Sequence, residues 1–249
     1  MTHYSRTTHV RDSRLDTHDA SWTASRLSAW TLALALPMAP ATALAAEYGV
    51  TYTGEIWSNQ RGGIKRGTAW LDNLDFTLLL DTDQALGWSD TTVYGHVLYN
   101  NNTTLTDRLV GDIQGISNID NTTMVSVMEL WIEKQYSAES SVKLGLYDLN
   151  SEFDAIETAG LFINPSHGIG PDYSQSGENG PSIFPVSSLA VRIQHALPTG
   201  SELRFAVLDA VPGDPDNNNY GGIKLDSDEG ALLALELTHQ FAHHRIGLG

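Results

Sequence analysis

Apolar and polar side chains alternate with a period of two along most of this chain. The clearest example runs from Leu71 to Leu80, where apolar residues at even positions from Leu74 onward alternate with polar residues such as Asn73 and Asp75. A period of two predicts β-strands with one apolar and one polar face. The pattern recurs around residues 48–57, 91–99, 124–133, 142–147, 189–194, 203–207 and 233–238, and a further strand begins at Arg245. We therefore expect about eight strands and the start of a ninth.

The segments between these strands fall into two classes of length. Short connections lie at 87–90, 138–141 and 198–200, whereas long ones span 100–123, 150–187 and 212–230. Short connections at one end and long ones at the other are typical of an outer-membrane β-barrel. The best helical candidate, 151–161, lies inside the longest connection. One apolar and one polar face also fit a water-soluble β-sandwich, so the pattern alone leaves barrel and sandwich open.

If the strands form a barrel wall, the apolar positions should face outward and the polar ones inward. We expect a curved antiparallel meander, in which neighbours in sequence are neighbours in the sheet. Its convex side should carry Leu74, Phe76, Leu78, Leu144 and Leu146. The same reading places Met124, Met128, Leu130 and Ile132 together on the apolar face, opposite Glu129, Trp131 and Glu133.

The composition excludes several classes of function. The chain has 14 Lys and Arg against 30 Asp and Glu, a formal net charge of -16, which repels nucleic-acid phosphates. It has no cysteine, so disulfides, thiolate metal ligands and a thiol nucleophile are excluded. No run of about eighteen apolar residues of the kind that forms a transmembrane helix occurs.

Residues 1–45 have the features of an export signal. Arginines such as Arg6 and Arg26 precede an apolar stretch of about ten residues, Leu27 to Leu36, and Ala43 and Ala45 are small residues at positions that a signal peptidase reads. We expect cleavage after Ala45, which leaves residues 46–249 as the mature domain. The alternative is a disordered N-terminus on a cytoplasmic protein.

Candidate chemical groups give little sign of catalysis. His239, His243 and His244 could suggest a metal, but no Glu follows His239, and a solvated turn is the better interpretation. The oxygen-rich run 214–219 lacks the spacing of a calcium loop. Glu129 and Glu133 share a strand face about 13 Å apart, too far for a glycosidase pair. We expect no catalytic residue, no metal and no cofactor.

Several runs resemble the carbohydrate-selective outer-membrane porins, the glucose porin or OprB-type family. They include Gly-Asp-Ile-Gln at 111–114, Glu-Leu-Trp-Ile-Glu at 129–133, and a long match from Gly145 to Arg192 that contains Gly-Leu-Tyr-Asp-Leu-Asn-Ser-Glu-Phe-Asp. The resemblance covers the mature chain from about Gly49 onward. It implies an all-β, antiparallel transmembrane barrel of about sixteen strands in the full family, of which this chain holds the N-terminal half. We therefore expect a truncated or partial chain.

The resemblance also implies passive diffusion of sugars such as glucose across the outer membrane of a Gram-negative bacterium, with lipid around the wall. The segment from Asp148 to Phe184 corresponds to the family's inward-folded constriction loop. Inward-facing aromatic and charged residues would then contact sugars, because rings stack on sugar faces and charged groups bond hydroxyls strongly. A secreted β-sandwich, as a carbohydrate-binding module or glycoside hydrolase, is the competing class. The expected pore-lining residues are Asp75, Tyr94, Glu129, Trp131, Glu133, Tyr147, Asp148, Glu152, Asp154, Arg192 and Arg204.

Overall fold

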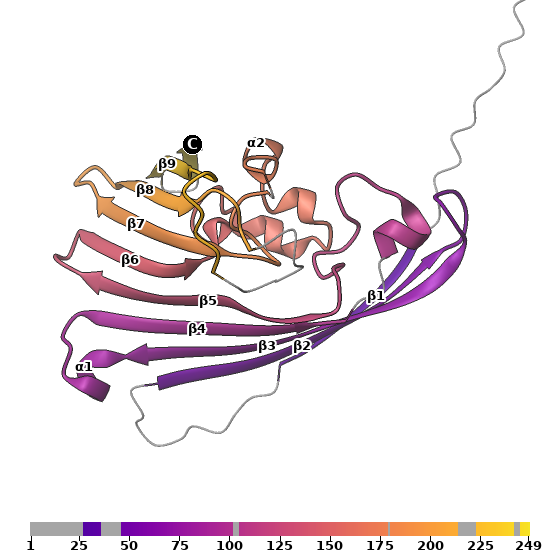
Figure 1. Cartoon of the computed structure of the whole chain (residues 1–249), viewed down its shortest axis with the longest axis horizontal. Coiled ribbons are helices and arrows are strands. Elements are labelled where there is room, and N and C mark those ends of the chain that lie inside the picture. The colour runs from indigo at the N-terminus through magenta and orange to yellow at the C-terminus, as the bar shows by residue number, and fades with distance from the viewer. Residues whose placement is uncertain (1–26, 36–45, 102–104, 179, 214–222, 242–244) are drawn as a thin grey trace, which may run out of the picture.

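A computed structural model describes residues 27–35, 46–101, 105–178, 180–213, 223–241 and 245–249 (Figure 1). All of its strands belong to one sheet, in which each pairs antiparallel with its neighbour in sequence. The strands are β1 (Leu27–Ala35), β2 (Ala46–Asn59), β3 (Gly67–Asp81), β4 (Thr91–Asn100), β5 (Met124–Gln135), β6 (Ser140–Tyr147), β7 (Ser188–Ala196), β8 (Ser201–Asp209), β9 (Ala231–Gln240) and β10 (Arg245–Leu248). The expected meander is confirmed. The described residues contain no second sheet, so the stacked layers of a sandwich are not present among them.

The sheet is open and curved, and its long connections gather at one end (Figure 1). At the other end, β3 and β4 are joined through the short helix α1 (Thr82–Leu86), and the β5–β6 and β7–β8 connections are tight turns. The β4–β5 connection contains one π-helical turn (Thr106–Val110). The β6–β7 connection contains 3₁₀ turns at Leu149–Ser151, Glu157–Leu161 and Pro165–His167 and the helix α2 (Pro171–Ser174). The expected helix at 151–161 is thus only partly present. No helix within the described residues is long and apolar enough to cross a membrane.

The two faces of the sheet differ as the alternation predicts. On the convex face, Phe76, Leu144 and Leu233 remain 47%, 53% and 65% exposed. The concave face carries buried polar groups, including Glu55, Lys143 and Arg192. An exposed apolar outer face and a polar inner face are the arrangement of a barrel wall in lipid.

One strand departs from simple alternation. His96 of β4 pairs with Glu129, but the next residue, Val97, pairs with Val127, so Met128 is an extra residue in β5. Such a β-bulge resets which residues face each side. Met124 and Met128 are therefore buried with Leu98 and Phe184, and the expectation that they share the outer face with Leu130 and Ile132 was wrong.

The structure adds a strand that the sequence did not predict. Leu27–Ala35 pairs along β2, from Leu27 opposite Asn59 to Ala35 opposite Thr51. This strand lies inside the expected export signal, whose residues 1–26 and 36–45 are outside the described part of the chain. Cleavage after Ala45 stays a prediction, and it would leave β2 as the edge strand of a nine-stranded sheet.

The β6–β7 connection packs onto the concave face through a small apolar core. Leu149 and Phe153 are fully buried there against Tyr147 and Leu208. Alanines on three adjacent strands complete the core, namely Ala190, Ala206 and Ala234. Because alanine side chains are small, this part of the wall has room for a phenylalanine from the loop. Figure 1 shows the helical turns of this connection on the inner side of the sheet.

Candidate functional site

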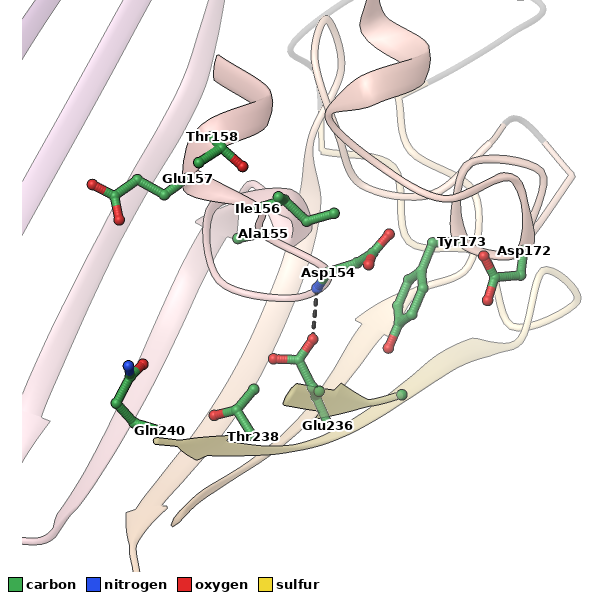
Figure 2. Close-up of a pocket in the computed structure, with 12 residues that line it drawn as sticks. Asp154, Ala155, Ile156, Glu157, Thr158, Asp172, Tyr173, Glu236, Thr238 and Gln240 are labelled. Atoms are coloured by element: carbon green, nitrogen blue, oxygen red, sulfur yellow. Dashed lines mark hydrogen bonds between the residues drawn. The ribbon is translucent and has the colours of Figure 1, made fainter. Parts of the chain in front are cut away.

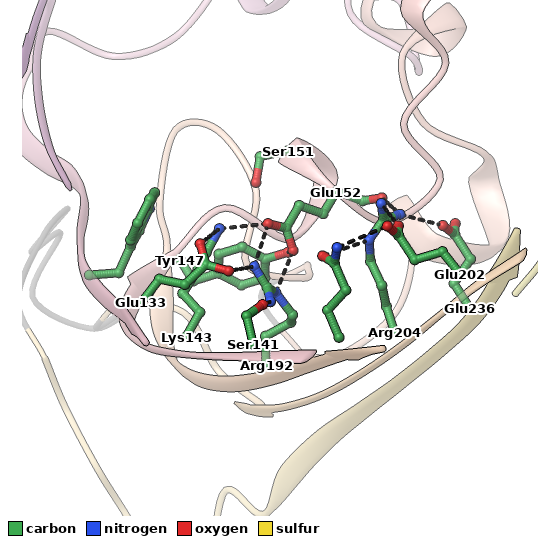
Figure 3. A network of polar contacts seen from close by, with 12 residues as sticks. Glu133, Ser141, Lys143, Tyr147, Ser151, Glu152, Arg192, Glu202, Arg204 and Glu236 are labelled. Carbon is green, nitrogen blue, oxygen red and sulfur yellow. Dashed lines mark hydrogen bonds and ion pairs between the residues drawn. The ribbon is translucent and has the colours of Figure 1, made fainter. Parts of the chain in front are cut away.

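Glu152 joins the long β6–β7 connection to the strands beneath it (Figure 3). One of its carboxylate oxygens lies 2.6 Å from the Lys143 Nζ atom and 2.8 Å from an Arg192 Nη2 atom. The other accepts a hydrogen bond of 2.8 Å from the Tyr147 hydroxyl. Arg192 also contacts Glu133 at 2.9 Å. The expected residues Glu133, Tyr147, Glu152 and Arg192 therefore form one network.

The charges in this network depend on one another. Lys143 and Arg192 are 5% and 1% exposed, and buried cations are costly unless paired. Burial by itself would raise the pKa of Glu152, but the positive charges of Lys143 and Arg192 outweigh that effect and leave the pKa below its ordinary value. Glu152 thus remains a carboxylate and links the loop to two cations of the sheet.

A second network around Arg204 continues along the concave face (Figure 3). Its guanidinium donates to the backbone carbonyl of Glu152 at 2.9 Å and to Glu236 at 3.2 Å, and it also pairs with Glu202. Glu236 in turn accepts from the backbone N–H of Asp154 at 2.7 Å. The start of the loop is therefore fastened to β6, β7, β8 and β9.

The remaining inward residues of the middle strands gather around Trp131. Tyr94 stacks on Trp131 with ring centroids 5.1 Å apart, and the Lys143 Nζ atom lies 4.1 Å from the Trp131 ring. Glu129 accepts from the Trp131 indole N–H at 3.2 Å. Farther along the face, Asp75 contacts His96 at 2.9 Å. Aromatic rings and charges thus lie together as expected, but most of their polar atoms contact one another.

Asp148 lies where β6 ends and the loop begins. Burial raises its pKa to about 7, and the negative charge of nearby Glu129 adds to the rise. The Asp148 carboxylate accepts from the backbone N–H of Asn150 at 3.0 Å and so caps the first 3₁₀ turn of the loop. Asp148 therefore shapes the loop's entry into the concave space.

A cavity of about 740 Å³ separates the loop from the end of the sheet (Figure 2). Its charged lining is acidic and comprises Asp154, Glu157, Asp172 and Glu236, and the other lining residues include Tyr173, Thr238 and Gln240. Among the side chains that the structure describes, no lysine or arginine lines it. Burial, together with Glu236 and Asp154, raises the pKa of the Tyr173 phenol, so this side chain stays neutral. The cavity offers hydroxyl-binding carboxylates and one aromatic ring.

The structure separates the expected site residues into two groups. Asp154 lines the cavity, whereas the other ten lie in the surrounding networks of the concave face. Lys143, Tyr173 and Glu236 were missed. Glu236 and Lys143 could have been predicted, because each lies at a polar position of an alternating strand. Tyr173 could not, because it lies in a loop without periodicity.

The possible metal sites suggested by the sequence, at His239, His243 and His244 and at 214–219, lie only partly within the described residues. Among the described residues, no three His, Asp or Glu side chains are placed to hold a metal ion. His243, His244 and the run 214–219 lie outside the part of the chain that the structure describes.

Comparisons with known proteins agree with this architecture. Residues 65–248 match the family described as carbohydrate-selective porin, OprB family. A solved structure, the high-pH structure of Pseudomonas putida OprB, superposes with a TM-score of 0.65 at 16% identity, over 78% of this chain and 48% of that one. The chain thus spans about half the length of that porin. A search of curated proteins found no match.

Proposed function

Because this chain belongs to the OprB family of carbohydrate-selective porins, we propose that it forms part of the wall and constriction of an outer-membrane pore for sugars. One observation carries the proposal: the β6–β7 connection folds back onto the polar concave face and is fastened there by Glu152. A loop inside a barrel narrows the lumen, and a narrow lumen brings solutes into contact with its lining. Diffusion requires no catalytic group or cofactor, and the proposal includes neither.

The cavity lining supports neutral sugars as the solutes. Carboxylates accept hydrogen bonds from sugar hydroxyls, and such charge-assisted bonds are stronger than neutral ones. Asp154, Glu157 and Asp172 would supply these bonds, and Tyr173 offers a ring face for a pyranose. An anionic sugar would be repelled by the same carboxylates. We assign sugar contact to the cavity residues, and we assign Glu133, Lys143, Glu152 and Arg192 to holding the loop.

The outer apolar face supports placement in lipid. Leucines, isoleucines and phenylalanines cover the convex side of the sheet and remain exposed, as a lipid-facing wall requires. Export through a leader cleaved after Ala45 and insertion into the outer membrane of a Gram-negative bacterium are parts of the same proposal. The sandwich alternative would need a second layer on this apolar face, and the described strands form a single sheet.

The test is sugar passage through a complete barrel. Residues 46–249 would be fused to the C-terminal half of Pseudomonas putida OprB, refolded into liposomes and followed by swelling in isosmotic glucose. We expect swelling with glucose that is faster than with glucuronate, because the cavity is acidic. Protein-free liposomes are the control. A folded, detergent-dependent chimera that admits neither sugar would overturn the proposal.

A further inference from the structure

The β4–β5 connection forms a second ordered segment over the concave face. Glu55 of β2 is buried and accepts hydrogen bonds from the Ser117 hydroxyl at 2.6 Å and from the Trp57 indole N–H at 2.5 Å. Leu105 and Ile119 pack against Trp57 in the same place. This segment is therefore fixed to the strands at the far side of the sheet from Glu152.

Next to Ser117, the same segment touches the tip of the β6–β7 connection. The backbone N–H of Asn118 donates to Ile163 O at 2.8 Å, and its side-chain amide donates to Phe162 O at 3.0 Å. In the other direction, the Asn164 side-chain amide donates to Gly115 O at 2.7 Å. Gly115 has φ +75°, and a Cβ atom there would lie 3.0 Å from Pro165, so this close approach favours glycine.

We propose that Asn118 and Asn164 are positioning residues that hold the tip of the constriction loop over the lumen. The loop then has two anchors, since Glu152 fixes its start to the sheet and the asparagine pair fixes residues 162–164 to the β4–β5 connection. The span between the anchors includes Ile156 and Glu157, which line the cavity. The tip anchor therefore sets how far this span extends into the passage. The anchoring is inferred from the hydrogen bonds of Asn118 and Asn164, while its effect on sugars rests on the proposed pore function.

Aspartate substitutions can remove the anchoring hydrogen bonds while keeping the local turn intact. Asn164 also caps the Pro165–His167 turn, because its side-chain oxygen accepts from the Ser166 N–H at 2.9 Å. Asn164→Asp keeps that acceptor but replaces the donor that reaches Gly115 O. Asn118→Asp likewise removes the donation to Phe162 O. Asn121→Asp is the matched control, because the Asn121 amide contacts Met124 rather than the constriction loop.

Amide hydrogen exchange of the refolded chain in detergent micelles provides the readout. In the N118D/N164D double variant, we expect the Asn118, Ala159 and Phe162 amides to exchange about three to ten times faster, as the loss of one or two hydrogen bonds implies. The Phe153 amide, bonded to Leu149 O at 2.9 Å beside the other anchor, should exchange as before. N121D should behave as the unsubstituted protein.

Unchanged exchange at the tip, or equal acceleration at Phe153, would overturn the anchoring. In the complete chimeric barrel, the double variant should admit a disaccharide more rapidly relative to glucose. Faster exchange with unchanged sugar discrimination would overturn the role in the passage. If the unsubstituted chimera admits no sugar, the pore proposal fails, and the exchange experiment still decides the anchoring.

Discussion

At the scale of single residues, the concave face is built from charges that are stable only in combination. Lys143 and Arg192 point into the space that the β6–β7 connection occupies, and Glu152 from that connection lies between them. A buried ion pair adds little net stability, but removal of one partner leaves a costly unpaired charge. The network therefore favours one docked position of the loop over others.

Replacement of Glu152 tests this dependence. Glu152→Gln keeps the shape of the side chain but removes the charge opposite Lys143 and Arg192. We expect the free energy of unfolding to fall by about 3 kcal/mol, the usual cost of breaking a buried pair. Urea unfolding of the refolded protein in detergent measures this. Glu178→Gln is the control, since Glu178 is an exposed loop carboxylate, and equal stability of the two variants would contradict the prediction.

Asp148 predicts a pH dependence of the opposite sign to that of an ordinary paired carboxylate. Its pKa is raised to about 7, so the folded protein binds this proton more tightly than the unfolded chain does. Stability should therefore fall as pH rises from about 4 to about 7. Glu152 contributes with the opposite sign, because its pKa is lowered in the folded protein, but this contribution changes only at the acidic end of the window, near and below the ordinary glutamate pKa of about 4.3.

Asn at position 148 isolates this contribution. Asp148→Asn keeps an acceptor for the Asn150 N–H but cannot ionise. We expect the variant to gain stability relative to the parent protein as pH rises from 4.5 to 7.5, measured by urea unfolding in detergent. A stability difference that does not change with pH would show that burial does not control this carboxyl.

At the scale of elements, the alternation of side chains was sufficient to predict β2 to β10 and their order, whereas β1 was not predicted. Apolar residues at every second position mark the outer face, namely Leu74, Phe76 and Leu78 in β3 and Leu233, Leu235 and Leu237 in β9. The bulge at Met128 was not predictable. The extra residue turns Met124 and Met128 toward the concave face, but methionine is apolar on either face, so the sequence pattern does not reveal the change. The loop turns and the cavity were also beyond reach, since their positions depend on contacts such as Glu152 with Arg192, between residues 40 apart in sequence.

Gly145 shows how closely β5 and β6 approach each other. Its φ is +144°, and a Cβ atom at this position would lie 2.2 Å from Leu130 O, a backbone atom that cannot rotate away. Gly145→Ala should therefore destabilise the protein by about 2 kcal/mol or more, through backbone strain. Gly95→Ala is the matched control in β4, because a Cβ atom there meets only Leu130 Cδ1 at 3.9 Å. Equal unfolding midpoints in urea would refute the argument.

At the scale of the whole molecule, the sheet of the described residues has two edges. β1 and β10 lie at opposite ends of the strand order, and the described chain aligns with 48% of the P. putida porin. In lipid, each unpaired backbone N–H or C=O group costs several kcal/mol, which is why membrane sheets close into barrels. The curvature of a wide pore cannot be closed with half its strands unless strand tilt and stagger change throughout.

We therefore predict that residues 46–249 by themselves neither insert stably into lipid nor conduct sugar. Eight strands can close a narrow barrel, but side chains fill such an interior and leave no passage for a sugar. The experiment refolds this fragment into liposomes and follows swelling in isosmotic glucose, with protein-free liposomes as the control and the chimeric barrel as the positive reference. Rapid glucose-dependent swelling by the fragment would show that nine strands suffice, for example through edge-to-edge pairing of two copies. That result would refute the argument from unpaired edges while leaving the docked loop and its anchors in place.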